Sequence, residues 1–367
     1  AQASATVLKE LINQPVHQAK LLRRIASIYH RIGNSAKTVE LTKHCLAILE
    51  STPNAPAFDI LNSHELLGIG YGSVLEEDAA KHHLEIAIQG YERLEGPNSL
   101  LALGARSNLL TSSYADLRQE STLKKQLEIF VATREQLGLE HSMVRRLMGN
   151  IGAIYLGLCR YGEGESWIRH SVQLYAKHVG ENHPNALIMQ MNLTSLLLRQ
   201  ERWKEARPLI DKGLANSIEV HGEKTRIPIS FLFNRAYCKF QSGDLDGAKP
   251  DYLKALQDCH EIFPENHPLT IFIESYWANT LREMGEIAES ATILARVHSE
   301  QVSQFGQNHP DVHQTLYYLA RTRKAQGLLQ EALTLAQKVV DLTPPEQWEF
   351  KQRSELLKSI EADIANK

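Results

Sequence analysis

Apolar residues along this chain recur at spacings of three and four, the pattern of helices that bury one face. The stretch HPDVHQTLYYLARTRKAQGLLQEALTLAQKVVDL shows this well. One face of a first helix collects Val312, Leu316, Leu319 and Ala320. After Gly327, one face of a second helix collects Leu329, Ala332, Leu333, Ala336 and Val339. Alternating β-branched runs bounded by hairpin turns are absent, so the pattern predicts an all-α chain built from helix pairs.

A 42-residue period organises these pairs. The tripeptide Asn-His-Pro begins at Asn182, Asn266 and Asn308, at intervals of 84 and then 42 residues. Steps of 42 along the chain meet Gly, Asn or Pro at Asn54, Gly96, Gly138, Gly180, Gly222, Pro264 and Gly306. These residue types form turns, so the period predicts loops between repeats near these seven positions.

Two further registers hold small residues at fixed points of each repeat. The first reads Ala26, Gly68, Leu110, Gly152, Thr194, Ala236, Ala278 and Ala320, in which only Leu110 is bulky. The second reads Thr38, Ala80, Thr122, Gly164, Ala206, Ala248, Ser290 and Ala332. Small side chains at two matched points predict that the two helices of each repeat approach closely there, in eight successive repeats.

The Asn-His-Pro tripeptide has a structural interpretation. Asn suits an N-cap, Pro suits the first turn of a helix, and we interpret the His as a packing or capping residue of the loop. Metal binding needs several convergent ligands, and the sequence has no HExxH or comparable pair.

The small-residue registers lie 12 residues apart and an apolar residue precedes the first, as in Leu319 and Trp277. This pattern resembles the tetratricopeptide repeat, and the 42-residue form punctuated by G-x-N-H-P is similar to the kinesin-light-chain type. The resemblance covers about residues 12–347. It implies a right-handed superhelical solenoid of about eight helix-turn-helix repeats, with the first helices on the concave face.

Three segments follow from this interpretation. Residues 17–347 form the repeat array, and residues 348–367 form a C-terminal capping helix whose apolar stripe holds Leu356, Leu357, Ile360 and Ile364. Residues 1–16 form an N-terminal helix, from Ala5 to Asn13, or the stump of an upstream domain in the same polypeptide. The start of the array is similar to the repeat regions that follow the kinase domain in some bacterial Ser/Thr kinases.

Composition narrows the function classes. The 367 residues carry a net charge of −3, without the basic footprint of a nucleic-acid-binding protein, and no apolar run reaches the roughly 18 residues that span a bilayer. The four cysteines are scattered without a CxxC pair, which favours a reducing, cytoplasmic compartment. The sequence has no P-loop, GxGxxG, GxSxG or metal-ligand cluster, so we expect no catalytic residue, cofactor or metal.

The tetratricopeptide resemblance also implies candidate binding residues on the concave side. Two positions before the first small register it places a ladder of Asn108, Asn150, Asn192 and Asn234, together with Tyr276 and Tyr318. Around them it places Arg146, Met191, Phe233, Tyr237, Phe272, Asn279, Tyr317 and Arg321. An Asn amide can pair with both the N–H and the C=O of an extended peptide. In the alternative interpretation, these Asn side chains join neighbouring repeats and the aromatic rings pack between them.

These expectations favour a non-enzymatic scaffold that binds an extended peptide or a protein partner in the concave groove. A second hypothesis is a regulatory or sensor region of a larger signalling protein, such as a Ser/Thr kinase or a transcription regulator. A third is a structural role through self-association of the end repeats.

Overall fold

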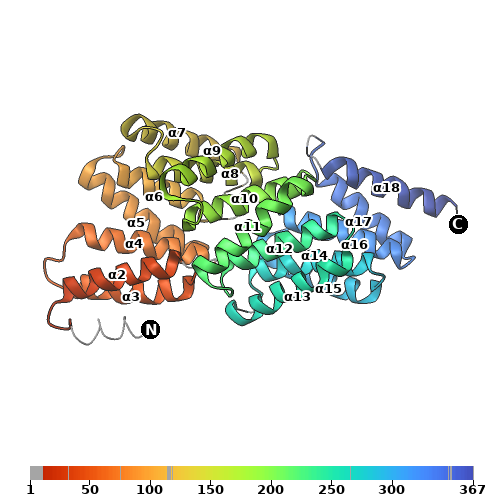
Figure 1. Cartoon of the computed structure of the whole chain (residues 1–367), viewed down its shortest axis with the longest axis horizontal. Helices are drawn as coiled ribbons and strands as arrows, with labels where there is room; N and C mark the ends of the chain where they lie inside the picture. The colour runs from red at the N-terminus through yellow and green to blue at the C-terminus, as the bar shows by residue number, and fades with distance from the viewer. Residues whose placement is uncertain are drawn as a thin grey trace. The chain divides into compact units, whose positions relative to one another are not determined.

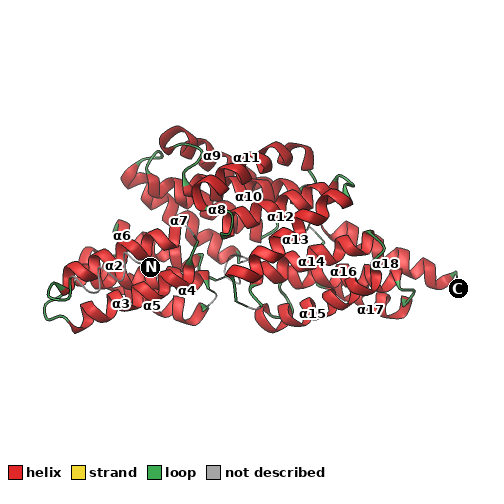
Figure 2. Ribbon diagram, turned by 60° about the horizontal axis from the view of Figure 1, so that its bottom comes forward, coloured by secondary structure: helices red, strands yellow, loops and turns green. Residues whose placement is uncertain are grey.

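The computed structural model describes residues 11–31, 33–74, 76–113, 117, 119–264, 266–345, 347 and 349–366. Within these ranges the chain forms seventeen helices and no strand, which confirms the predicted all-α class (Figure 2). The helix predicted from Ala5 to Asn13 lies mostly outside the described residues, and residues 11–13 form a turn. Among the described residues, no helix is both long and apolar enough to cross a bilayer.

The helices alternate between first and second members of successive pairs (Figure 1). The first helices are α2 (Pro15–Arg31), α4 (Ala57–Ser73), α6 (Leu100–Leu110), α8 (Ser142–Gly157), α10 (Pro184–Arg199), α12 (Arg226–Gln241), α14 (Pro268–Glu283) and α16 (Pro310–Ala325). The second helices are α3 (Ser35–Ser51), α5 (Glu77–Glu95), α7 (Glu120–Leu137), α9 (Tyr161–Val179), α11 (Trp203–His221), α13 (Leu245–Ile262), α15 (Ile287–Phe305) and α17 (Leu329–Asp341). The chain then continues into α18 (Glu349–Ala365). This is an all-α repeat solenoid.

Backbone contacts divide the chain into two compact units. The first unit contains residues 1–158 and 162–192, and the second contains residues 159–161 and 193–367. The first nine residues of α10 belong to the first unit and its remaining residues to the second. Each unit is described separately below.

The small-residue registers mark the close approach of the two helices in a pair. Ala26 and Thr38 are both fully buried, and the Thr38 hydroxyl donates to the Ala26 carbonyl at 3.4 Å. At Gly152 an added Cβ would lie only 2.3 Å from Cγ1 of Ile168 on the second helix of the same pair. A larger side chain therefore has no room at these positions, which is the physical reason for the small residues found there.

The helix caps correct one prediction. Asn was expected to cap the helix in Asn-His-Pro, but the cap is the His: Nδ1 of His267 accepts the backbone N–H of Leu269, and Nδ1 of His309 accepts that of Asp311, both at 3.2 Å. The same 42-residue register uses His141 to cap α8. An imidazole accepts in this position because its ring nitrogen reaches the backbone N–H of the second helical residue.

The rings of the capping His residues also pack. His267 stacks on Phe263 with a centroid separation of 3.9 Å, and His309 stacks on Phe305 at 4.5 Å. The predicted packing or capping role of the His is therefore confirmed, and Pro stands at the start of α14 and α16 as expected. Asn266 instead adopts a left-handed backbone conformation, with φ of 61°, which Asn tolerates better than most residues.

In the turns between the two helices of a pair, residues 42 positions apart adopt the same left-handed backbone conformation. Gly243, Gly285 and Gly327 adopt φ values of 78° to 88°, as a tight helix end requires. Cys159 and Glu201 occupy the same register with φ of 58°, so two non-glycine residues hold the left-handed conformation there.

Helix α18 follows the last pair and packs on it. Ile360 is fully buried in a cluster with Ala320, Ala332 and Ala336, and the partly buried Leu356 and Ile364 join this cluster. The domain boundaries at residues 16 and 347 stay predictions.

Candidate functional site

The first unit contains a polar cavity between four first helices. It measures about 330 Å³, and eight residues line it: Glu65, Leu100, Leu101, Gly104, Ser142, Met143, Arg146 and Asn185. They come from α4, α6, α8 and α10, so successive repeats each contribute side chains to one space. A cavity with a few convergent polar groups on an apolar lining is typical of a binding site.

A hydrogen-bonded chain of three residues forms the polar part of this cavity. Nη1 of Arg146 donates to Oδ1 of Asn108 at 2.6 Å, and Nδ2 of Asn108 donates to Oε1 of Glu65 at 2.8 Å. The hydroxyl of Tyr91 donates to the other oxygen of Glu65 at 3.0 Å. Glu65 is therefore already satisfied by the protein, whereas Arg146 uses one of its five N–H donors within the described residues.

Burial shifts the pKa values of Glu65 and Arg146, the two charged residues of this hydrogen-bonded group. Burial raises the pKa of Glu65, although the hydrogen bond from Tyr91 and the charge of Arg146 act in the opposite direction. Burial likewise lowers the pKa of Arg146, and Glu65 partly offsets this effect. Each charge favours the ionised form of the other, although Glu65 and Arg146 are joined only through Asn108. The guanidinium of Arg146 therefore stays available to a ligand.

Gly104 keeps the cavity open. An added Cβ there would lie 3.5 Å from Cε of Met143 and 3.8 Å from Nη2 of Arg146, at ordinary contact distances. A methyl group would thus fit, but a longer side chain would fill the space beside the guanidinium.

The asparagine ladder forms bonds between repeats. Nδ2 of Asn150 donates to the Ser107 hydroxyl at 3.1 Å, and Asn234, which is 1% exposed, donates to Thr194 at 2.9 Å and to Ser195 at 3.1 Å. These contacts match the alternative in which the ladder joins neighbouring repeats. Asn192 is half-buried and makes no side-chain hydrogen bond among the described residues, and Met191 is also half-buried.

The second unit gathers the predicted aromatic residues into one cluster. The ring of Phe233 lies 5.1 Å from that of Phe272 and 5.2 Å from that of Tyr276. Tyr276 also lies 4.9 Å from Tyr237 and 5.6 Å from Tyr318. Phe233, Tyr276 and Tyr318 are buried and pack between first helices, whereas Tyr237 and Phe272 are half-buried.

The remaining predicted residues of this unit lie on α14 and α16, which also contribute rings to the cluster. Asn279 is buried and accepts from Arg282 at 2.9 Å. Arg321 is half-buried, forms an ion pair with Glu283 at 3.0 Å, and lies over the ring of Tyr317 at 5.7 Å. Its charge is thus already neutralised within the protein.

Two charged residues on the first helices were not predicted. Glu65 immediately precedes a ladder position, but its own register shows no repeated residue type. Arg199 is the last residue of α10, and its guanidinium carbon lies 6.0 Å from the ring of Phe272 and 5.7 Å from that of Tyr276. Both residues act through neighbours on other helices, which no periodicity along the chain reveals.

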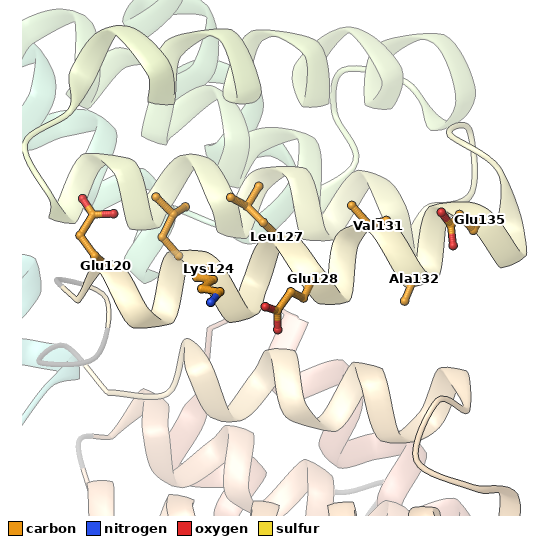
Figure 3. A pocket seen from close by; sticks show the side chains of 8 residues that line it. Glu120, Lys124, Leu127, Glu128, Val131, Ala132 and Glu135 are labelled. Carbon is orange, nitrogen blue, oxygen red and sulfur yellow. The ribbon is translucent and has the colours of Figure 1, made fainter.

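A second hollow lies on the surface of α7 (Figure 3). It measures about 540 Å³, and its lining consists of Glu120, Leu123, Lys124, Leu127, Glu128, Val131, Ala132 and Glu135. Because one helix supplies the whole lining, its polar groups do not converge on a common point as those around Arg146 do. We therefore take the cavity of the first helices as the candidate site.

Comparisons with known proteins agree with the fold. Family models described as tetratricopeptide repeat match residues 143–219 and 229–257. Tetratricopeptide repeat protein 19, mitochondrial, from Mus musculus is 36% identical over 103 residues, which are 26% of this chain and 27% of that protein. The chain therefore aligns with only about a quarter of the length of this curated relative.

Two solved structures show the same fold over nearly the whole chain. A Rap protein complexed with Competence and Sporulation Factor has a TM-score of 0.61 and 10% identity, covering 95% of this chain and 99% of that one. NprR in complex with its cognate peptide NprX has a TM-score of 0.60 and 14% identity, covering 98% and 99%. A kinesin light chain with TPR-like repeats from Podosopora anserina has a TM-score of 0.40 and 19% identity, covering 54% and 93%.

The helix pairs of the structure recur at the period predicted from the sequence. The first helices begin at Pro15, Ala57, Leu100, Ser142, Pro184, Arg226, Pro268 and Pro310, almost uniformly 42 residues apart. With the matches above, this period agrees with the predicted resemblance: residues 143–219 and 229–257 match tetratricopeptide repeats, and the same helix pair recurs along the described residues.

Proposed function

We propose that this chain binds an extended peptide, or an extended segment of a partner protein, on the face formed by its first helices. The observation that carries the proposal is the cavity lined by residues of four successive first helices, at which Asn108 links the lining residues Glu65 and Arg146 by hydrogen bonds. Repeat solenoids use such stacked faces as extended binding surfaces.

The chemistry of the cavity suits a peptide backbone. Arg146 has N–H donors left over for a carbonyl or carboxylate oxygen, and Ser142 and Asn185 offer both donors and acceptors. Leu100, Leu101 and Met143 provide apolar contacts for a side chain. Structures that share the fold hold peptides: the Rap protein is complexed with Competence and Sporulation Factor, and NprR with its cognate peptide.

The same proposal includes a binding role without catalysis, and a cytoplasmic location. Support for the location comes from the four cysteines, which form no disulfide among the described residues and suit a reducing compartment. NprR is described as a quorum sensor, which supports the related proposal that the peptide acts as a signal for a larger regulatory protein.

Peptide-display selection on the purified chain tests the proposal, with Gly104→Leu as the blocking variant. Leu at this position fills the cavity beside Arg146. Gly162→Leu is the matched control, because Gly162 is exposed and an added Cβ there meets no atom within 4 Å. We expect a shared motif to enrich on the wild type and on Gly162→Leu, but not on Gly104→Leu.

Helicity and melting of each variant are compared first, so that loss of folding is recognised. Should Gly104→Leu unfold, Arg146→Gln removes the guanidinium while retaining a shorter, uncharged polar side chain. Equal enrichment on all folded variants would place peptide binding elsewhere, and absence of any enrichment would contradict the proposal.

A further inference from the structure

Arg199 occupies an aromatic setting in the second unit. Its guanidinium lies over the rings of Phe272 and Tyr276, and its side chain is half-buried. Tyr161 and Tyr237 lie close enough to influence its charge. Aromatic faces attract a guanidinium and hold its plane in one orientation, but they do not accept its in-plane N–H groups.

The guanidinium of Arg199 has no anionic partner within the described residues. It forms no hydrogen bond and no ion pair within 4.0 Å of a carboxylate there, and Asp311 influences it only from a longer distance. Other acids of the unit are engaged elsewhere: Glu349 accepts from Tyr161 at 2.8 Å, and Glu283 accepts from Arg321 at 3.0 Å. A partly buried charge without a partner is unfavourable, and an anion would relieve it.

A second buried guanidinium adds positive charge to the same unit. Arg353 on α18 is 4% exposed and donates to Thr343 at 2.5 Å and to Gln314 at 3.4 Å, both neutral acceptors. Burial lowers the pKa of Arg353, Glu349 opposes this shift, and the positive charge of Arg199 adds to it. The two arginines therefore repel each other within one unit, and a carboxylate at Arg199 would offset that repulsion.

We propose that Arg199 is the receptor for a carboxylate group of the bound peptide, with the rings of Phe272 and Tyr237 receiving an aromatic or apolar side chain beside it. The inference rests on the proposed function and names the chemistry that the second unit selects. A planar guanidinium presents two parallel N–H donors to the two oxygens of a carboxylate. The aromatic rings beside Arg199 already hold its side chain in place, so little flexibility is lost on binding.

Three short probes test the inference on the whole chain: Ac-Phe-Glu-Phe-NH2, its Gln counterpart Ac-Phe-Gln-Phe-NH2, and Ac-Phe-Gln-Phe with a free C-terminus. Binding is followed by the Nε–Hε resonance of Arg199 in an NMR spectrum, assigned by its absence in Arg199→Lys. We expect the resonance to shift with a carboxylate probe and not with the amidated Gln probe. Whether the Glu probe or the free C-terminus acts shows which source of carboxylate the site prefers.

Arg199→Gln supplies the affinity measurement. It should weaken binding of the effective probe by about tenfold or more, as expected for loss of a charge-assisted hydrogen-bond pair. Arg134→Gln is the matched control, since Arg134 also lies over an aromatic ring, that of Phe130, but belongs to the second helix α7 of the first unit, and it should leave binding unchanged.

Two results would overturn the inference. Equal shifts with all three probes would show peptide binding without carboxylate recognition, and would leave the proposed function standing. No shift with any probe up to about 10 mM, where even a millimolar affinity is detectable, would exclude a carboxylate site at Arg199. The display selection decides separately whether peptides bind at all.

Discussion

Nδ1 of His64 on α4 lies 2.8 Å from Nδ1 of His83 on α5, so one imidazole donates a hydrogen bond to the other across the helix pair. Tyr71 stacks on His83 with an angle of 3° between the ring planes. Burial lowers the pKa of His83 to about 4, with the neighbouring His64 and His82 contributing in the same direction. A neutral histidine pair thus joins the two helices of the second repeat.

This pair predicts a loss of stability in acid. Because the folded pKa of His83 lies below its ordinary value of 6.5, the unfolded chain binds more protons in this range. The contribution is fully present above pH 6.5 and is lost as the pH falls from there toward 4. Urea unfolding at several pH values should show a falling midpoint in this window, and His83→Gln should weaken the dependence. An unchanged pH profile in His83→Gln would contradict the role of the pair.

The histidine cap of α14 predicts a measurable contribution to stability. His267→Ala removes the acceptor for the backbone N–H of Leu269 and the stacking on Phe263. We expect a loss of about 1–2 kcal/mol in the free energy of unfolding, measured by chemical denaturation. His267→Asp, which supplies a carboxylate oxygen as the acceptor in place of Nδ1, should recover part of the loss. Equal losses in both variants would show that stacking, and not capping, is the contribution of the ring.

The close approach at Gly152 predicts intolerance of larger residues. Gly152→Leu should destabilise the chain by about 1–3 kcal/mol, because the new side chain overlaps Ile168. Gly162→Leu, at an exposed position, serves as the control and should melt at or above the wild-type temperature, since Leu favours a helix more than Gly does. A Gly152→Leu variant as stable as the wild type would mean that the helices separate freely at this register.

The asparagine ladder predicts different outcomes at two of its positions. Asn234→Ala removes a buried amide that donates to Thr194 and Ser195, and should cost about 1–3 kcal/mol. Asn192→Ala, without such bonds, should change stability by no more than about 0.5 kcal/mol. Thermal unfolding of both variants distinguishes a ladder that joins repeats from one that serves only a ligand. Similar melting temperatures for the two variants would favour the ligand-facing interpretation of Asn234.

The sequence alone determined the all-α fold, the 42-residue period and the close contact of the two helices in each repeat. These features are local, because a helix and its partner are separated by a short turn and repeat their residue types at fixed spacing. Val312, Leu316 and Ala320 are buried as their spacing predicts. The capping position was predicted within one residue, and the error arose because Asn is the commoner cap whereas the imidazole reaches the same N–H group.

Only the tertiary structure decided which side chains meet across repeats. Asn108, Arg146 and Glu65 belong to three different helices, and their hydrogen bonds depend on how far each helix is offset from the next. The same dependence left Arg199 unnoticed, since nothing in its neighbourhood along the chain shows that Phe272 and Tyr276 lie beside it. Periodicity determines which face of a helix is buried, whereas the chemistry of a site depends on distances between helices that periodicity does not encode.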